Sequence, residues 1–337
     1  METVYFLGID IAKKKFDGAL TVDGKAFHRV ESGNTAKDIK ALFKDLKKKF
    51  SISYSQLVVC MEHTGIYCHP LLDVLTENHI KVCVESSIQI KRSQGMVRGK
   101  TDKIDAQRIS SYAYRNRENL HFWTPQRLII QKLKAMLVTR ERLIRAKTEL
   151  QVPINECEEF IDESIQQMMI KACQNTINRL ERDIANIEKM IDDLVKEDAQ
   201  LNHQYQLATS VTGIGKITAL SMIVSTGEFT RIQEAKKFAC YSGVAPFEHS
   251  SGSSIRGKTR VSKMANMTIK KLLHLCAMAA ARYDQELQAY YQRKVSEGKN
   301  KMSVINAVRN KLISRVFACI NSNRKYQKIY KHALHET

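Results

Sequence analysis

The sequence Val4-Tyr5-Phe6-Leu7-Gly8-Ile9-Asp10, near the N-terminus, indicates how the fold begins. A short apolar run with β-branched and aromatic residues that ends on a polar one predicts a buried strand. A second strand is predicted over residues 16–22 and a third over residues 26–30. They flank the turn Asp23-Gly24-Lys25, and an Asp-Gly pair between two such runs is typical of a hairpin. The chain therefore begins with three strands in a meander.

Helical and strand patterns alternate after this meander. Residues 35–50 place apolar side chains on one helical face and lysines on the other. The further elements predicted are strands at 57–61 and 80–84, and helices at 67–78 and, after a basic loop, at about 101–116. We expect residues 1–120 to form an α/β domain with a ribonuclease H-like sheet.

A long helical segment is predicted from about Thr124 to Leu201, with a break near Pro153. Thr124-Pro125 is a good helix start, because a capping hydroxyl precedes proline at the first helical position. Apolar residues then recur in alternating steps of three and four, which is a heptad seam. The seam residues are Ile170, Cys173, Ile177, Leu180, Ile184, Ile187, Ile191 and Leu194. An intermolecular coiled coil and a helical hairpin within one chain fit this pattern equally well. We expect a helical connector over residues 124–203.

The C-terminal part, residues 204–330, is predicted to be a mainly α domain. It opens with Val211-Thr212-Gly213-Ile214-Gly215-Lys216 between apolar helices, a spacing typical of a helix-hairpin-helix. Glycine amides and a helix N-terminus can receive a phosphate. Gly213, Gly215 and Lys216 are therefore candidate nucleic-acid contacts, although a plain glycine turn fits the same residues.

The charge of the chain points to a polyanionic partner. Over 337 residues, 54 Lys and Arg stand against 35 Asp and Glu, which gives a net charge of +19. Neutralising phosphates with such an excess releases counterions, so nucleic acid is the expected partner. The alternative is a basic housekeeping protein whose lysines only keep it in solution. The eight cysteines have no CxxC spacing, which favours reduced thiols over a zinc site. The sequence has no secretory signal and no membrane-length apolar run, so a cytoplasmic protein is expected, nucleoid-associated when active.

Four carboxylates follow strand ends or begin a helix. Asp10 closes the first strand, and Glu62 follows the strand at 57–61. Asp102 and Asp105 lie three residues apart at a helix start, so they share one face. Each acid has a structural explanation, such as capping a turn or a helix, or solvation. Together they favour a metal site, since Mg²⁺ prefers oxygen ligands and phosphodiester chemistry uses such ions.

A basic stretch adjoins these acids and favours a site that holds metal and phosphate together. It contains Lys91, Arg92, Arg98, Lys100, Lys103 and Arg108. Of these, Arg98 and Lys100 are the candidate nucleic-acid contacts.

A second candidate site lies in the hydroxyl-rich segment over residues 241–260. Between Glu248 and Asp284 the chain has no acid, whereas Arg256, Lys258 and Arg260 fall inside this window. A glycine-hinged loop in a positive field is a plausible phosphate-facing loop, and a serine hydroxyl there could attack phosphorus. A flexible linker has a similar composition, so the composition does not decide between the two.

Taken together, the motifs resemble one family, the DEDD transposases (recombinases) of insertion sequences, related to the Piv-type DNA invertases. The resemblance covers about residues 3–320, and the order and spacing of the motifs are its specific features. The motifs are Leu7-Gly8-Ile9-Asp10-Ile11-Ala12-Lys13, Glu62-His63-Thr64-Gly65-Ile66-Tyr67, Gly99-Lys100-Thr101-Asp102-Lys103-Ile104-Asp105-Ala106, Thr212-Gly213-Ile214-Gly215 and Ser251-Gly252-Ser253-Ser254-Ile255-Arg256-Gly257.

The resemblance implies a RuvC-like domain, a helical connector and a C-terminal transposase domain. It implies that Asp10, Glu62, Asp102 and Asp105 bind Mg²⁺, with Mn²⁺ as a substitute, and that Ser251 is the nucleophile. It also implies a dimer or tetramer in which the acids of one subunit and the serine of another form a composite site. Donor and target DNA would be paired with a structured RNA encoded by the element. Ser250 directly precedes Ser251, which leaves the choice of nucleophile open by one residue, and Val244 replaces a frequent leucine.

We therefore expect a recombinase that cuts and rejoins DNA through a phosphoserine, with Arg256, Lys258 and Arg260 steadying phosphate. Two other hypotheses fit the sequence. One is a RuvC-like nuclease or junction resolvase that uses water as nucleophile. The other is a nucleic-acid-binding protein without catalysis.

Overall fold

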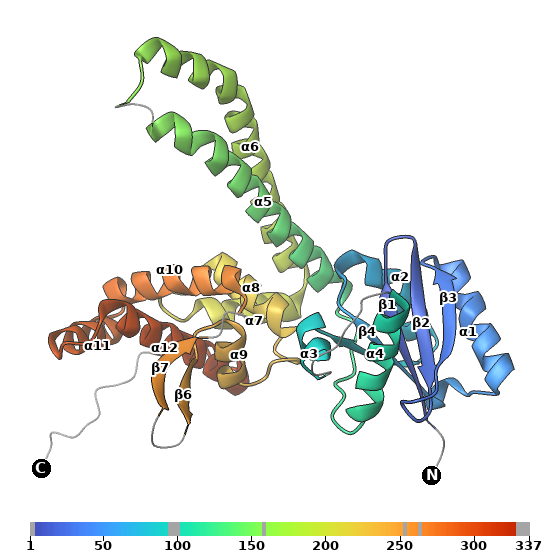
Figure 1. Ribbon diagram of the computed structural model, residues 1–337. Coiled ribbons are helices and arrows are strands. Elements are labelled where there is room, and N and C mark those ends of the chain that lie inside the picture. Colours follow the sequence, from blue (N-terminus) through green and yellow to red (C-terminus); the bar gives the residue numbers. More distant parts are fainter. Residues whose placement is uncertain (1–3, 94–101, 157–159, 252–254, 262–264, 328–337) are drawn as a thin grey trace, which may run out of the picture. The chain divides into compact units, whose positions relative to one another are not determined.

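The computed structural model describes residues 4–93, 102–156, 160–251, 255–261 and 265–327. The chain divides into two compact units, residues 1–125 and residues 126–337. The first unit contains a mixed five-stranded sheet, and the second is mainly helical (Figure 1). An α/β N-terminal domain followed by a helical C-terminal part, as predicted, is confirmed.

The sheet of the first unit has the strand order β3-β2-β1-β4-β5. Strands β1, β2 and β3 pair antiparallel, whereas β4 and β5 are parallel to β1. The strands are β1 (Tyr5–Ile11), β2 (Lys15–Thr21), β3 (His28–Gly33), β4 (Leu57–Glu62) and β5 (Lys81–Glu85). The predicted meander is therefore confirmed, and the two later strands extend the sheet on the other side of β1.

The third strand begins at His28, later than the sequence predicted. The Asp23 carboxylate accepts hydrogen bonds from the backbone N–H groups of Lys25 and Ala26, at 2.8 and 2.9 Å. These bonds extend the turn through Ala26, because a short acidic side chain can satisfy the backbone of a turn in place of a partner strand.

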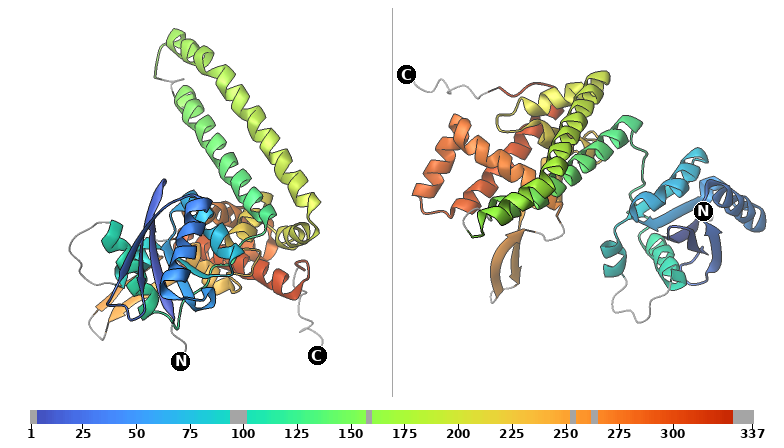
Figure 2. Two further views of the ribbon diagram at one scale, coloured as in Figure 1. Left: turned by 90° about the vertical axis from the view of Figure 1, so that its right-hand side faces the viewer. Right: turned by 90° about the horizontal axis from the view of Figure 1, so that it is seen from above.

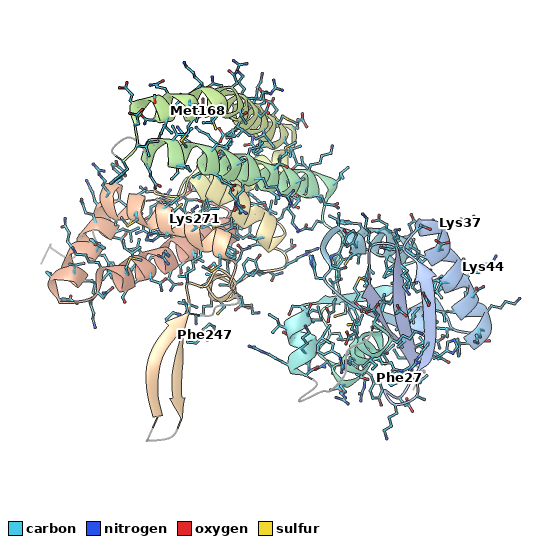
Figure 3. All side chains as sticks on the ribbon, turned by 45° about the horizontal axis from the view of Figure 1, so that its top comes forward. Phe27, Lys37, Lys44, Met168, Phe247 and Lys271 are labelled. Carbon is cyan, nitrogen blue, oxygen red and sulfur yellow. The ribbon has the colours of Figure 1, made fainter. Side chains whose placement is uncertain are left out.

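The two faces of the sheet are covered by different helices. On one face, α1 (Ala36–Phe50) and α2 (His69–Glu77) pack against the apolar side chains of the strands. The predicted amphipathic pattern of α1 is confirmed, with Lys37 and Lys44 on its outer side (Figure 3). On the other face lie α3 (Ser87–Arg92) and α4 (Asp102–Arg115). Short 3-10 turns, Tyr54–Gln56 and Gly65–Cys68, precede β4 and α2.

Helix α4 lies directly on β1 at Gly8. A Cβ atom at Gly8 would stand 2.2 Å from the backbone nitrogen of Ser110 and 2.4 Å from the carbonyl oxygen of Ala106. The Ser110 hydroxyl donates to the carbonyl of Phe6 at 2.9 Å. Glycine is therefore needed at this point of the strand, because any side chain would push the helix away. The contacts also show that α4 runs antiparallel to β1, with its first turn toward the strand's end.

The second unit begins with a long antiparallel pair of helices, α5 (Leu128–Glu156) and α6 (Glu163–Glu197) (Figure 2). Ion pairs join the two helices at Arg140 and Glu188, 2.6 Å, and at Lys147 and Glu181, 2.7 Å. Of the two arrangements that the heptad seam left open, the hairpin within one chain is therefore observed. Pro153 does not break α5, which continues to Glu156, so the break predicted near residue 153 falls a turn later.

A helical body follows the hairpin and shares one core with its base. Its helices are α7 (Ala199–Thr209), α8 (Lys216–Thr226), α9 (Ala235–Tyr241), α10 (Met267–Tyr283), α11 (Gln285–Ser296) and α12 (Lys301–Ser322). Between α9 and α10 lies a two-stranded antiparallel hairpin, β6 (Pro246–Ser251) and β7 (Ile255–Val261). The prediction of a loop over the serine segment was therefore wrong. The polar composition suggested a loop, but residues 246–251 and 255–261 pair with each other as antiparallel strands.

Among the described residues, no helix is both long and apolar enough to cross a bilayer. The described cysteines are free thiols. Five of the seven are buried, as their apolar neighbours predicted, whereas Cys240 is exposed.

Candidate active site

Asp10 and Glu62 lie next to each other at the ends of two paired strands. Strands β1 and β4 are parallel, and their register matches Ile9 with Met61. The next residue on each strand is the acid. Side chains in register on neighbouring strands point to the same face, so the two carboxylates share the α4 side of the sheet.

Helix α4 adds the other two predicted acids to the same place. The helix contacts β1 through Ser110 at Phe6 and through Ala106 and Ser110 at Gly8. Two residues along a strand cover about the same length as one helical turn, roughly 6 Å. The first turn of α4, with Asp102 and Asp105, therefore lies beside Asp10, which is two residues beyond Gly8.

The pKa of Asp10 reports the same convergence. Burial, followed by the negative charges of Glu62, Asp102 and Asp105, raises the pKa of the Asp10 carboxyl to about 6. Each of the other three predicted acids thus lies close enough to disfavour ionisation of Asp10. The structure brings the four acids into one electrostatic neighbourhood.

Two of the four acids, Glu62 and Asp105, accept hydrogen bonds from neighbouring side chains. The Ser87 hydroxyl, at the start of α3, donates to Glu62 Oε2 at 2.7 Å. The Arg108 guanidinium donates to Asp105 Oδ1 at 2.7 Å. Within the ranges that the structure describes, no three Asp, Glu, His or Cys side chains are grouped closely enough to hold a metal ion as they stand. The carboxylates repel one another, and two of them are hydrogen-bonded to Ser87 and Arg108. This arrangement fits a site whose negative charge a divalent cation would neutralise.

Three further acids, which were not predicted from the sequence, continue the row of carboxylates across the sheet. Asp17 stands opposite Asp10 on β2, Glu31 stands opposite Asp17 on β3, and Glu85 stands opposite Glu62 on β5. Asp17 is 5% exposed, and Lys15 Nζ lies 3.8 Å from it. A polar residue inside an apolar strand, as in Phe16-Asp17-Gly18, is the sequence signal that could have identified Asp17.

We predict that Asp10 makes the stability of the metal-free protein fall as pH rises. The folded-state pKa, about 6, lies above the ordinary value of 3.8, so the stabilisation is complete below pH 3.8 and is lost as pH passes 6. Replacing Asp10 by Asn removes this dependence. After a discount for solvent screening, Asp10→Asn should gain on the order of 1 kcal/mol over wild type between pH 4.5 and pH 7. Urea unfolding of both proteins in a chelating buffer measures the difference. A gap that stays constant with pH would contradict the prediction.

The glycine turn of the second unit joins α7 and α8 as predicted. Gly213 has a φ of +93°, and a Cβ atom there would lie 2.7 Å from the Cβ of Ala280, so this glycine serves packing. Gly215 caps the N-terminus of α8 and lies in open space. Lys216 pairs with Asp192 of α6 at 2.6 Å, so its ammonium is already engaged within the unit.

The serine hairpin is described at the level of its backbone. Ser251 ends β6 opposite Ile255, and Ser250 stands opposite Arg256. Lys258 and Arg260 lie on β7. Gly252, Arg98 and Lys100 lie outside the described residues.

Comparison with known proteins gives family matches over both units. A transposase profile of the DEDD IS110 type matches residues 7–157. A second profile, described as Transposase IS116/IS110/IS902 family, matches residues 205–292. The chain is 28% identical over 335 residues to the pilin gene-inverting protein of Moraxella bovis. This aligned region covers 96% of this chain and 98% of that protein. It is also 24% identical over 286 residues to the transposase for insertion sequence element IS1111A of Coxiella burnetii. That aligned region covers 75% of this chain and 72% of the Coxiella protein.

These matches, with acids clustered at the strand ends of an α/β unit, define a DNA-processing enzyme of the transposase and recombinase class. More particularly, the chain belongs to the IS116/IS110/IS902 family of transposases. The family predicted from the sequence motifs is confirmed.

Proposed function

We propose that the protein is an insertion-sequence transposase or site-specific recombinase that cuts and rejoins DNA through a phosphoserine intermediate. The observation that carries the proposal is the convergence of Asp10, Glu62, Asp102 and Asp105 on one face of the sheet. We further propose that the first unit is RuvC-like, with a ribonuclease H-like sheet. The strand order β3-β2-β1-β4-β5, with three antiparallel strands followed by two parallel ones, supports this fold.

The four acids would hold Mg²⁺, or Mn²⁺ in its place. When bound, such ions neutralise the carboxylates and stabilise negative charge on the oxygens of a reacting phosphate. The raised pKa of Asp10 supports this use, because a half-buried carboxylate among three others is electrostatically unsatisfied without a cation. Ser87 and Arg108 would orient Glu62 and Asp105 through the hydrogen bonds that they already make.

Ser251 would supply the nucleophile. Its oxygen forms a bond to phosphorus while the bond between phosphorus and one strand oxygen breaks, so that a DNA strand leaves with a free hydroxyl. The serine proton is lost as the new bond forms, and the departing oxygen gains one. The reverse reaction with a different strand hydroxyl rejoins DNA, since the phosphoserine keeps the energy of the phosphodiester. Arg256, Lys258 and Arg260 on β7 would steady the phosphate, and Arg98, Lys100 and Gly215 would contact the nucleic acid away from it.

The partners proposed are donor and target DNA, a structured guide RNA and further copies of the chain. The net charge of +19 supports nucleic-acid partners. Along the α6 seam, Ile170, Cys173 and Leu180 are only half-buried in one chain. This exposure supports a dimer or tetramer in which a second copy packs along the seam. Such a protein would act in the cytoplasm, on the nucleoid.

Mixing two inactive variants tests the composite site. If the acids of one subunit act with the serine of another, an Asp10→Asn protein mixed with a Ser251→Ala protein should regain strand transfer. With random pairing, about a quarter to a half of the wild-type rate is expected, because mixed assemblies contain intact pairs of acids and serine. The assay is strand transfer on labelled DNA carrying the element ends, with each variant alone as control. Two variants that stay inactive together, although they co-assemble, would exclude the composite site.

A further inference from the structure

A buried hydrogen-bond chain lies beneath the root of the serine hairpin. Arg309 on α12 is 6% exposed, and its Nη2 donates to His274 Nδ1 on α10 at 2.6 Å. Its Nη1 donates to Asn306 Oδ1 at 3.3 Å, and Asn306 Nδ2 donates to the carbonyl oxygen of Val244 at 2.8 Å. Val244 is fully buried and lies two residues before β6 begins at Pro246.

A contribution to folding stability does not explain why Arg309 takes part in this hydrogen-bond network. The Nε of Arg309 has no hydrogen-bond partner, and no ion pair between Arg309 and a carboxylate is found among the described residues. A buried charge that is paired only with neutral groups costs free energy rather than supplying it. An apolar residue of similar size would satisfy this core position better.

The chain of bonds does fix the side-chain amide of Asn306. An amide has one acceptor and one donor end, and either end could face Val244. Because a guanidinium only donates, Arg309 holds the Asn306 oxygen toward itself and so turns the N–H₂ group toward the carbonyl of Val244. His274 in turn must present an unprotonated Nδ1 to Arg309. Burial and the Arg309 charge lower the pKa of His274, which keeps this ring neutral.

The other end of the hairpin is tied to the same body. The backbone N–H of Asn266, which follows β7, donates to the carbonyl of Tyr241 at 2.9 Å, and its side chain donates to the Tyr241 hydroxyl at 3.0 Å. Before β6, the N–H groups of Val244 and Ala245 both donate to the carbonyl of Ala239. The Asn306 bond is the one side-chain tie to the β6 root that comes from α12, among the contacts of the described residues.

We propose that Arg309, His274 and Asn306 are positioning residues, which set the direction in which the serine hairpin leaves the helical body. The inference rests on the proposed function of Ser251. It concerns residues that do not touch DNA: they act on the reaction through the carbonyl of Val244. Because a nucleophile misplaced by about 1 Å can cost a hundredfold in rate, a loose root would slow the attack on phosphorus without weakening DNA binding.

The variant that tests the proposal is Asn306→Asp. An aspartate still accepts from Arg309, so the buried guanidinium keeps a partner, but it cannot donate to the Val244 carbonyl. The matched control is Asn310→Asp, the same chemical change at an exposed position of α12. We expect Asn306→Asp to melt within about 3 °C of the control. Its amide hydrogens over residues 244–261 should exchange faster, and its covalent DNA adduct should form at least tenfold more slowly at unchanged DNA affinity.

Two further substitutions separate positioning from plain stabilisation. Arg309→Met should leave the melting temperature equal or higher while speeding exchange in the hairpin. His274→Asn, whose oxygen can stand where Nδ1 stood, should restore the adduct rate that His274→Leu loses. Equal exchange and equal adduct rates in Asn306→Asp and Asn310→Asp would overturn the proposal. The proposal would also be overturned if Arg309→Met lowered the melting temperature enough to explain a slower formation of the covalent DNA adduct. If the wild-type protein forms no serine adduct, the proposed function fails, whereas the exchange comparison still decides whether these residues anchor the hairpin.

Discussion

Ser251→Ala should abolish the covalent link between protein and DNA and reduce strand transfer at least a thousandfold. The reason is chemical, because alanine offers no oxygen to bond to phosphorus, and removal of a catalytic nucleophile leaves only the binding contribution of the site. DNA affinity should stay within about twofold, since one hydroxyl contributes little to a contact dominated by phosphate charges. A nicked substrate that traps the intermediate, followed on a denaturing gel, measures the adduct.

The matched control is Ser250→Ala, the neighbouring hydroxyl on the same strand. It should form the adduct within about threefold of the wild-type rate, because this serine is adjacent to the reacting residue and not itself the nucleophile. The reverse pattern, with Ser250→Ala inactive and Ser251→Ala active, would move the nucleophile by one residue. If both variants cut DNA at the wild-type rate, water is the nucleophile, and the enzyme is a RuvC-like nuclease.

Asp10→Asn should also reduce cleavage at least a thousandfold, for a different reason. Asn lacks the negative charge that holds a divalent cation, and Asp10 is the acid around which Glu62, Asp102 and Asp105 converge. The same change should remove the thermal stabilisation by Mn²⁺, because a ligand that binds only the folded state stabilises it in proportion to its affinity. Cleavage of labelled DNA and melting curves with and without Mn²⁺ give the two readouts.

The control for this prediction is Asp73→Asn, the same change on the exposed side of α2. It should leave the cleavage rate and the Mn²⁺ shift unchanged, although it removes the same charge from the first unit. Full cleavage activity in Asp10→Asn would exclude the metal site. No cleavage by wild type or by either variant, with equal DNA binding by all three, would favour a nucleic-acid-binding protein without catalysis.

Local sequence patterns predicted much of the first unit. An apolar run that ends on Asp10 and another that ends on Glu62 identify buried strands with acids at their ends, because strand burial is encoded locally. Their adjacency required more, since only the parallel pairing of β1 with β4 brings the two acids side by side. The requirement for glycine at position 8 could not be predicted locally either, because it arises from the close contact between β1 and the backbone of α4.

The features that could not be predicted from the sequence depend on contacts between residues far apart in the chain. Asp17 and Glu85 join the row of acids through strand register, which no single stretch of sequence reveals. The serine segment was expected to be a loop because of its glycine and serine content, yet residues 246–251 and 255–261 pair as antiparallel strands. The alternation of three and four along α6 left a second chain and a helix of the same chain open as partners, and only the structure identifies α5 of the same chain.

Mass spectrometry of the trapped complex tests whether the four acids and the serine hydroxyl act on one phosphate, as we propose. Wild-type protein is incubated with the trapping DNA and Mg²⁺, digested, and its peptides are searched for a nucleotide. We expect a nucleotide on Ser251 in the peptide spanning β6 and β7, and no nucleotide when Mg²⁺ is chelated or in the Asp10→Asn variant. Cleaved DNA without any nucleotide-bearing peptide, or a nucleotide on a residue outside this hairpin, would contradict the proposal.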